Sequence, residues 1–100
     1  MLPTHRLSLS TLVVRDYDEA IRFFVDKLGF TLIRDNQLEL GKRWVVVSPT
    51  LSDQSGLLLA RANDTLQQQC IGYQTGGRVA FFLTTTDFNA SYNLFLERGA

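Results

Sequence analysis

The side chains that most often carry catalysis or bind metals are scarce in this chain. It has one histidine, His5, and one cysteine, Cys70. A zinc site of the Cys/His type needs several such ligands, and a cysteine nucleophile needs a base beside it. No motif couples His5 to Cys70, so we expect a surface histidine. The Cys70 thiol is expected to be inert, because neither a basic residue nor a helix start lies near it in the sequence.

The carboxylates with the clearest pattern have a structural explanation. Glu19 follows Asp16 by three residues, which is the spacing of a helix capping box, and Asp87 precedes a second helical pattern in the same way. The remaining acidic residues fall on expected turns and helix surfaces. The sequence therefore predicts no catalytic residue and no metal ligand.

Length and charge narrow the class of protein further. The chain has 100 residues, and its ten Lys and Arg balance its ten Asp and Glu. This length predicts one domain with a modest core. A neutral balance argues against nucleic acid and against an anionic membrane as the main partner. No apolar run has the length of a membrane span and no signal-peptide pattern opens the chain, so we expect a cytoplasmic protein.

The first 62 residues have the pattern of a strand, a helix and three further strands. Residues 7–15 are rich in Leu, Val and Thr, which predicts a strand. A helix should begin at Asp16 and end at Gly29, which suits a left-handed C-terminal stop. Its expected buried stripe is Ala20, Phe23, Phe24 and Leu28. Strands are expected at 30–34, 43–47 and 57–62.

The rest of the chain repeats the beginning of this pattern. Residues 63–77 are polar and predict a connector, and residues 78–84 predict a strand. Asp87 lies 71 residues after Asp16, and Gly99 lies 70 residues after Gly29. Between them, Phe88, Tyr92, Phe95 and Leu96 form a second expected buried stripe. We therefore predict an α+β chain with one complete βαβββ module (1–62), a connector (63–77) and a truncated second βα module (78–100).

These residues resemble the vicinal oxygen chelate superfamily, which includes glyoxalase I, bleomycin-resistance proteins and extradiol dioxygenases. The resemblance rests on LVVRDYDEAIRFF at 12–24, KLGF at 27–30, and GRVAFFL at 77–83 leading to Asp87. Segments 42–47 and 71–78 are similar to a glyoxalase-like subgroup with no assigned activity. The resemblance implies that two βαβββ modules pair their sheets into a cup.

Metal-dependent members of this superfamily hold a divalent ion in the cup through His, Glu or Gln side chains. The resemblance places the first ligand on Leu9, the second on about Leu59, and the third on Arg78 or Ala80. Leucine and alanine offer no lone pair, and a guanidinium repels a cation. The resemblance therefore implies that the inherited metal site is absent and that no cofactor is needed.

Strand alternation predicts which side chains line the cup in place of a metal site. An apolar concavity with a few polar groups is the usual form of a small-molecule site. The indole of Trp44 and the ring of Phe82 could stack on a planar ligand, and Arg78 could hold an anionic group. The alternative is that the apolar members fill a collapsed core and that the arginines form rim ion pairs. The predicted ligand-binding residues are Leu9, Thr11, Trp44, Leu59, Arg61, Arg78 and Phe82.

Three hypotheses about function follow. The first is metal-free binding of a small apolar or amphipathic molecule, on the pattern of bleomycin-resistance proteins. The second is an enzyme of the same superfamily, lactoylglutathione-lyase-like or dioxygenase-like, with a divalent metal held by non-standard ligands. The third is a truncated structural remnant with no pocket. In each case an incomplete second sheet leaves apolar surface open, so we expect a homodimer, with or without exchanged modules.

Overall fold

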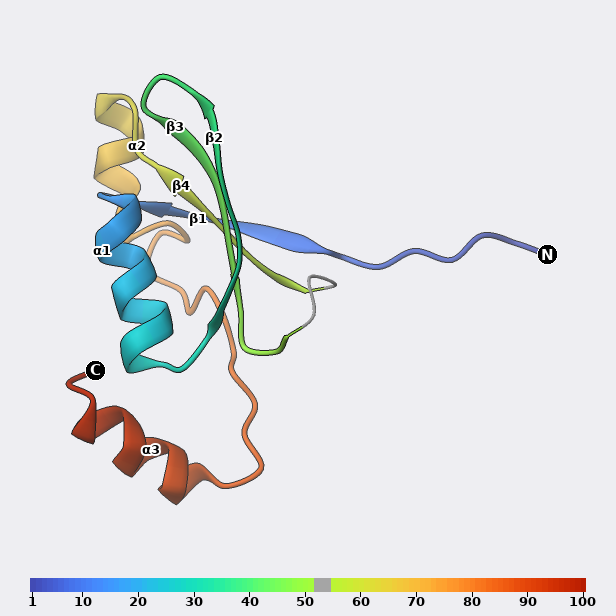
Figure 1. Cartoon of the computed structure of the whole chain (residues 1–100), viewed down its shortest axis with the longest axis vertical. Helices are drawn as coiled ribbons and strands as arrows, with labels where there is room; N and C mark the ends of the chain where they lie inside the picture. Colours follow the sequence, from blue (N-terminus) through green and yellow to red (C-terminus); the bar gives the residue numbers. More distant parts are fainter. Residues whose placement is uncertain (52–54) are drawn as a thin grey trace.

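The computed structural model describes residues 1–51 and 55–100. The chain builds one four-stranded sheet with the strand order β1-β4-β3-β2. The strands are β1 (Leu9–Val14), β2 (Thr31–Glu39), β3 (Lys42–Ser48) and β4 (Gly56–Arg61). β1 pairs with β4 in parallel, while β3 pairs antiparallel with both β2 and β4. The predicted mixed fold with a βαβββ order is confirmed (Figure 1).

One long helical segment covers one face of this sheet. It begins as the α-helix α1 (Tyr17–Ile21) and continues as the π-helical segment η1 (Arg22–Lys27). The Asp16 side chain accepts from the Glu19 amide at 2.8 Å, as the capping box predicts. Gly29 has a φ of 75°, so the left-handed stop is also confirmed. The wider π turns were not expected from the spacing of the apolar residues.

The core lies between this helix and the sheet. Its buried members are Val14, Tyr17, Ala20, Val45, Val47 and Leu59, with Leu12, Phe24 and Phe30 packed around them. Val45, Val47 and Leu59 have no exposed surface. Leu12 and Val14 face the helix as their alternation predicts. β2 extends to Glu39, beyond its predicted end, with irregular pairing between Leu32 and Arg34 and between Gln37 and Glu39.

The second half differs more from the prediction. The connector contains a short helix, α2 (Thr65–Cys70), which Asp64 caps and which contacts β1. Residues 78–84, predicted as a strand, form none. The open edge of β1 is occupied by Gln74, whose amide oxygen accepts from the Val13 amide (2.8 Å) and whose nitrogen donates to the Thr11 carbonyl (2.6 Å). A β-strand needs a neighbouring strand with free backbone groups to pair with. Residues 78–84 have no such neighbour here, so they form no strand.

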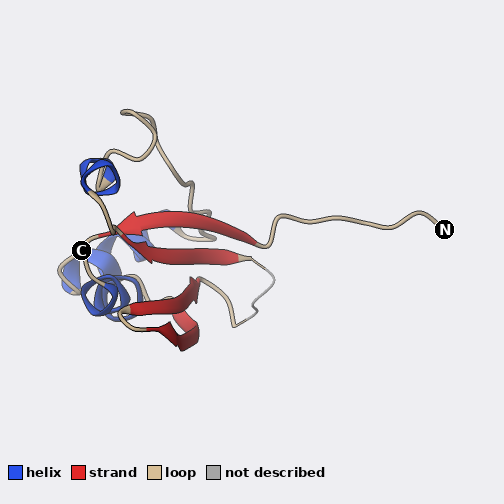
Figure 2. Ribbon diagram, turned by 90° about the horizontal axis from the view of Figure 1, so that it is seen from above, coloured by secondary structure: helices blue, strands red, loops and turns tan. Residues whose placement is uncertain are grey.

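The helix α3 (Phe88–Glu97) forms at the predicted place, with Asp87 accepting from the Ala90 amide at 3.0 Å. It lies apart from the sheet in Figure 1, and the first residues of the chain also extend away from the sheet (Figures 1 and 2). Its apolar stripe is not buried in this chain: Phe88 is 72% exposed and Tyr92 is 55% exposed. The rings of Phe88 and Tyr92 stack on each other with 6.1 Å between centroids.

Removal of the first helix cap should lower the stability of the module. Asp16→Ala leaves the Glu19 amide without its acceptor, which should reduce the free energy of unfolding by about 1 kcal/mol in urea titrations. Asp26→Ala is the matched control, because Asp26 is exposed on the same helical segment and caps nothing. Its effect should stay within about 0.5 kcal/mol. Equal losses in the two variants would contradict the capping role of Asp16.

Candidate functional site

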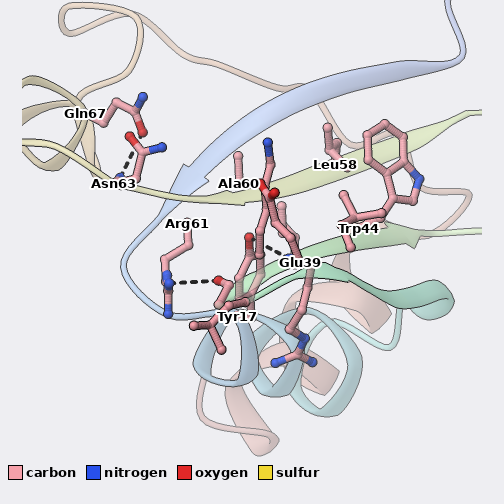
Figure 3. A pocket seen from close by; sticks show the side chains of 14 residues that line it. Tyr17, Glu39, Trp44, Leu58, Ala60, Arg61, Asn63 and Gln67 are labelled. Carbon is pink, nitrogen blue, oxygen red and sulfur yellow. Dashed lines mark hydrogen bonds between the residues drawn. The ribbon is translucent and has the colours of Figure 1, made fainter.

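A hollow lies at the end of the sheet where the β2–β3 hairpin turns. We call it the rim hollow; its volume is about 520 Å³. Its walls come from the hairpin, the end of β4, the start of α1 and the polar residues before and within α2 (Figure 3). Lining residues are Tyr17, Leu38 to Trp44, Leu58 to Arg61, Asn63 and Gln67.

The rim hollow opens where the ladder between β3 and β4 stops. The two strands pair at Val45–Leu59, Val46–Leu58 and Val47–Leu57 only. Beyond these pairs the backbone amide of Arg43 donates to the Tyr17 hydroxyl at 3.2 Å. Tyr17 is only 6% exposed, so a buried ring from the helix bonds the backbone of β3 where the ladder with β4 has ended.

Two guanidinium groups lie over the Tyr17 ring. The Arg43 group is 5.1 Å from the ring centroid and the Arg61 group is 5.6 Å from it. Both distances fall in the range of cation–π attraction. The Tyr17 ring therefore helps to hold both guanidinium groups in place at the rim.

The two arginines differ in how their charge is balanced. Arg43 donates to both carboxylate oxygens of Asp35, at 3.1 and 2.7 Å, and to Asp18 at 3.0 Å. The hydrogen bond that Arg43 donates to Asp35, ahead of the weaker effect of Asp18, raises the pKa of Arg43 above its ordinary value. Arg61 instead donates to the Gly41 carbonyl at 2.8 Å, and it has no ion pair among the residues that the structure describes.

The other side of the hollow is apolar. Paired residues on neighbouring strands share a face, so Leu58 and Ala60 lie with Thr11 and Val13 on the face turned away from α1. Trp44 lies on this side as well, with 37% of its surface exposed (Figure 3). The indole and these small aliphatic side chains thus line one side of the hollow, and Arg43 and Arg61 line the side next to α1.

The structure corrects the predicted faces of β4. Leu59 and Arg61 were expected to face the cup, but both lie on the helix side: Leu59 is in the core and Arg61 contacts Tyr17. The register pairs Leu59 with Leu12, which also faces the helix. Alternation could not decide this, because Leu57, Leu58, Leu59 and Ala60 are all apolar and suit either face.

The structure brings together three of the seven predicted residues and separates the others. Trp44 and Arg61 face the rim hollow, and Leu59, which has no exposed surface, lies behind its wall. Arg78 lies in a hollow of about 310 Å³ near Gln74, and Phe82 lies in another of about 290 Å³ near Phe24 and Leu57. Leu9 and Thr11 lie on β1, outside the rim hollow.

Sequence reasoning missed the residues that shape the rim, above all Tyr17 and Arg43. Their contacts join positions 26 residues apart, so no local pattern indicates them. The one available signal was an aromatic residue directly after the cap Asp16. The polar wall from Asn63 and Gln67 was also missed; the Gln67 side chain accepts from the Asn63 amide at 3.0 Å.

The residues at the superfamily's metal positions do not fit a divalent ion. With the corrected register, β4 offers Leu58 and Ala60 to the face turned away from α1, and β1 offers Leu9. None of these side chains has a lone pair to donate. Within residues 1–51 and 55–100, no three His, Cys, Asp or Glu side chains gather into a possible metal cluster.

Comparison with known proteins places this chain in a family. The sequence model of the Glyoxalase/Bleomycin resistance protein/Dioxygenase superfamily matches residues 6–100. The chain therefore belongs to this superfamily and is a glyoxalase-like domain. In its described part, no helix has the length and apolar character needed to cross a membrane.

An uncharacterised protein of Shewanella frigidimarina (strain NCIMB 400) is 59% identical over 83 residues, which are 82% of this chain and 62% of that protein. This chain thus spans about three fifths of that relative's length.

Two solved structures share the fold. The crystal structure of UcmS2 is similar with a TM-score of 0.80 and 23% identity, over 97% of this chain and 77% of that one. The crystal structure of TnmS3, an antibiotic binding protein from Streptomyces sp. CB03234, is similar with a TM-score of 0.73 and 26% identity. That match covers 99% of this chain and 74% of TnmS3.

The bond between Tyr17 and β3 should be measurable in stability. Tyr17→Phe leaves the Arg43 amide without its acceptor and should lower the free energy of unfolding by about 1 kcal/mol. Tyr17→Ala, which also empties core volume, should cost about 3–5 kcal/mol. Tyr73→Phe is the control, since Tyr73 is 62% exposed and should tolerate loss of its hydroxyl. If Tyr17→Phe were as stable as the control, the hydroxyl would not hold β3.

Proposed function

We propose that this chain binds a small, mainly apolar molecule reversibly, without chemistry and without a resident metal. The observation that carries the proposal is the rim hollow, whose volume of about 520 Å³ is in the usual range of ligand pockets. The lining of the rim hollow combines an exposed indole and an apolar wall with a few polar groups. The similarity to TnmS3, itself an antibiotic binding protein, supports binding as the function.

The metal-dependent enzyme is the competing function within the superfamily. A lyase or dioxygenase of this fold polarises substrate oxygens through its metal, and that requires ligand side chains. Leu9, Leu58, Ala60 and Arg78 cannot supply them. This chain's side chains therefore support binding better than they support catalysis.

Binding should be independent of divalent metal. The neutral two-ring amide 2-naphthamide should quench the emission of Trp44, the chain's only tryptophan. Its dissociation constant should change by less than about twofold between EDTA-treated protein and protein supplied with Zn²⁺, Ni²⁺ or Mn²⁺. Elemental mass spectrometry of protein dialysed without chelator should find far less than one metal per chain. Binding that appears only with a metal would overturn the proposal in favour of the enzyme.

We also propose that a second copy of the chain covers the apolar stripe of α3. Phe88 and Tyr92 on α3 and Phe82 before it are exposed by 72%, 55% and 88%. Contiguous apolar surface of this kind is uncommon on monomers and favours association. The second copy would cover this stripe whether or not the two copies exchange modules.

Light scattering after size exclusion should give about twice the chain mass of 11.3 kDa. Phe88→Ser should shift the protein toward the monomer, because it removes a large apolar group from the stripe. Leu66→Ser, on α2, is the matched control, since Leu66 is 71% exposed and lies outside the stripe. A monomeric wild type at high concentration, or equal effects of the two substitutions, would contradict this proposal.

A further inference from the structure

We propose that the rim hollow selects planar aromatic molecules that carry a single carboxylate, with Arg61 receiving the carboxylate and Trp44 stacking on the ring. This inference rests on the proposed binding function and adds the chemical class of the ligand.

Of the two arginines at the rim, Arg61 is the one that retains bonding capacity. Its guanidinium has five N–H donors in a planar fork, and the hydrogen bond to the Gly41 carbonyl uses the Nη2 end. The side chain is exposed at the end of β4 and lines the hollow. A planar guanidinium matches a carboxylate in geometry, so a bound carboxylate would meet a fork already held in place.

Tyr17 keeps this fork in position. The guanidinium of Arg61 lies 5.6 Å from the ring centroid, while Arg43 occupies the ring at 5.1 Å. Tyr17 is buried and bonded to β3, so the ring cannot follow Arg61 if the arginine moves. A long side chain at an exposed rim is thereby restrained before any ligand arrives, which reduces the entropy lost on binding.

The ion pairs at the rim belong to Arg43 and not to Arg61. Arg43 is paired from outside the hollow with Asp35 and Asp18. Glu39 lies opposite Lys42 in the β2–β3 register, and Arg61 has no carboxylate partner among the residues that the structure describes. A ligand carboxylate would give Arg61 that partner, whereas a dianion would bring a second negative charge toward Glu39.

The apolar wall determines the rest of the ligand. Trp44 presents a partly exposed indole on the same hollow, beside the small side chain of Ala60 and the aliphatic Leu58. A flat aromatic ring gains more from an indole than a branched aliphatic group does, through offset stacking. The hollow therefore fits an aromatic body with a carboxylate at one edge.

The test compares two probes that differ only in charge: 2-naphthoate and the neutral 2-naphthamide, both titrated against Trp44 emission. The wild type should bind 2-naphthoate at least about tenfold more tightly than 2-naphthamide. Arg61→Gln should abolish this preference, so that 2-naphthoate binds no more tightly than 2-naphthamide. Arg22→Gln is the matched control: it removes the same charge from an exposed helix position outside the rim hollow, and should keep the preference.

Arg61→Lys provides a second variant in case Arg61→Gln does not fold, which circular dichroism would reveal. It keeps the charge but loses the planar fork, so the preference should fall at least about threefold and stay above unity. An unchanged preference in Arg61→Lys and Arg61→Gln would overturn the role of Arg61. Equal wild-type affinities for the two probes would overturn the carboxylate class while the binding function stands. Failure of both probes to bind would overturn the binding function as well.

Discussion

The ring of Tyr17 joins the start of α1 to two strands of the sheet at once. Its hydroxyl accepts from the backbone of β3, and its faces carry the guanidinium groups of Arg43 and Arg61. The same ring belongs to the buried core, where it packs with Val45 and Leu59. Helix docking, the end of the β3–β4 ladder and the position of both arginines therefore depend on one side chain.

This arrangement links local sequence chemistry to the site. Asp16 caps the helix and so fixes the first helical residue, Tyr17, against the sheet. The ring then holds Arg43, whose charge is balanced by Asp35 and Asp18, and Arg61, whose charge is not. The hollow at the rim is thus a consequence of how the helix begins, and its charge follows from which arginine has carboxylate neighbours.

Much of the fold could be predicted because its determinants are local. Caps at Asp16 and Asp87, the left-handed Gly29 and the βαβββ order each follow from residues close together in the chain. The strand predicted at 78–84 was wrong because strand formation depends on a distant partner, and Gln74 already bonds the open edge of β1.

The site was harder to predict than the fold. Trp44 and Arg61 were predicted from their residue types and both line the rim hollow, but Arg61 and Leu59 were assigned to the wrong face because β4 is apolar on both sides. Tyr17 and Arg43 were missed because their contacts span distant positions. Leucine or alanine at the metal positions is visible in the sequence without a structure, and metal-free binding stays a prediction.

We propose that this chain binds its ligand in the hollow shaped by Tyr17. The sharpest test is a nitrogen–proton correlation spectrum of labelled protein during titration with 2-naphthoate. The largest shifts should fall on the Trp44 indole Nε1–H and the Arg61 Nε–H, with smaller shifts at the Arg43 amide. Shifts concentrated instead at residues 81–83, around the apolar hollow of Phe82, would rule out binding at the rim hollow.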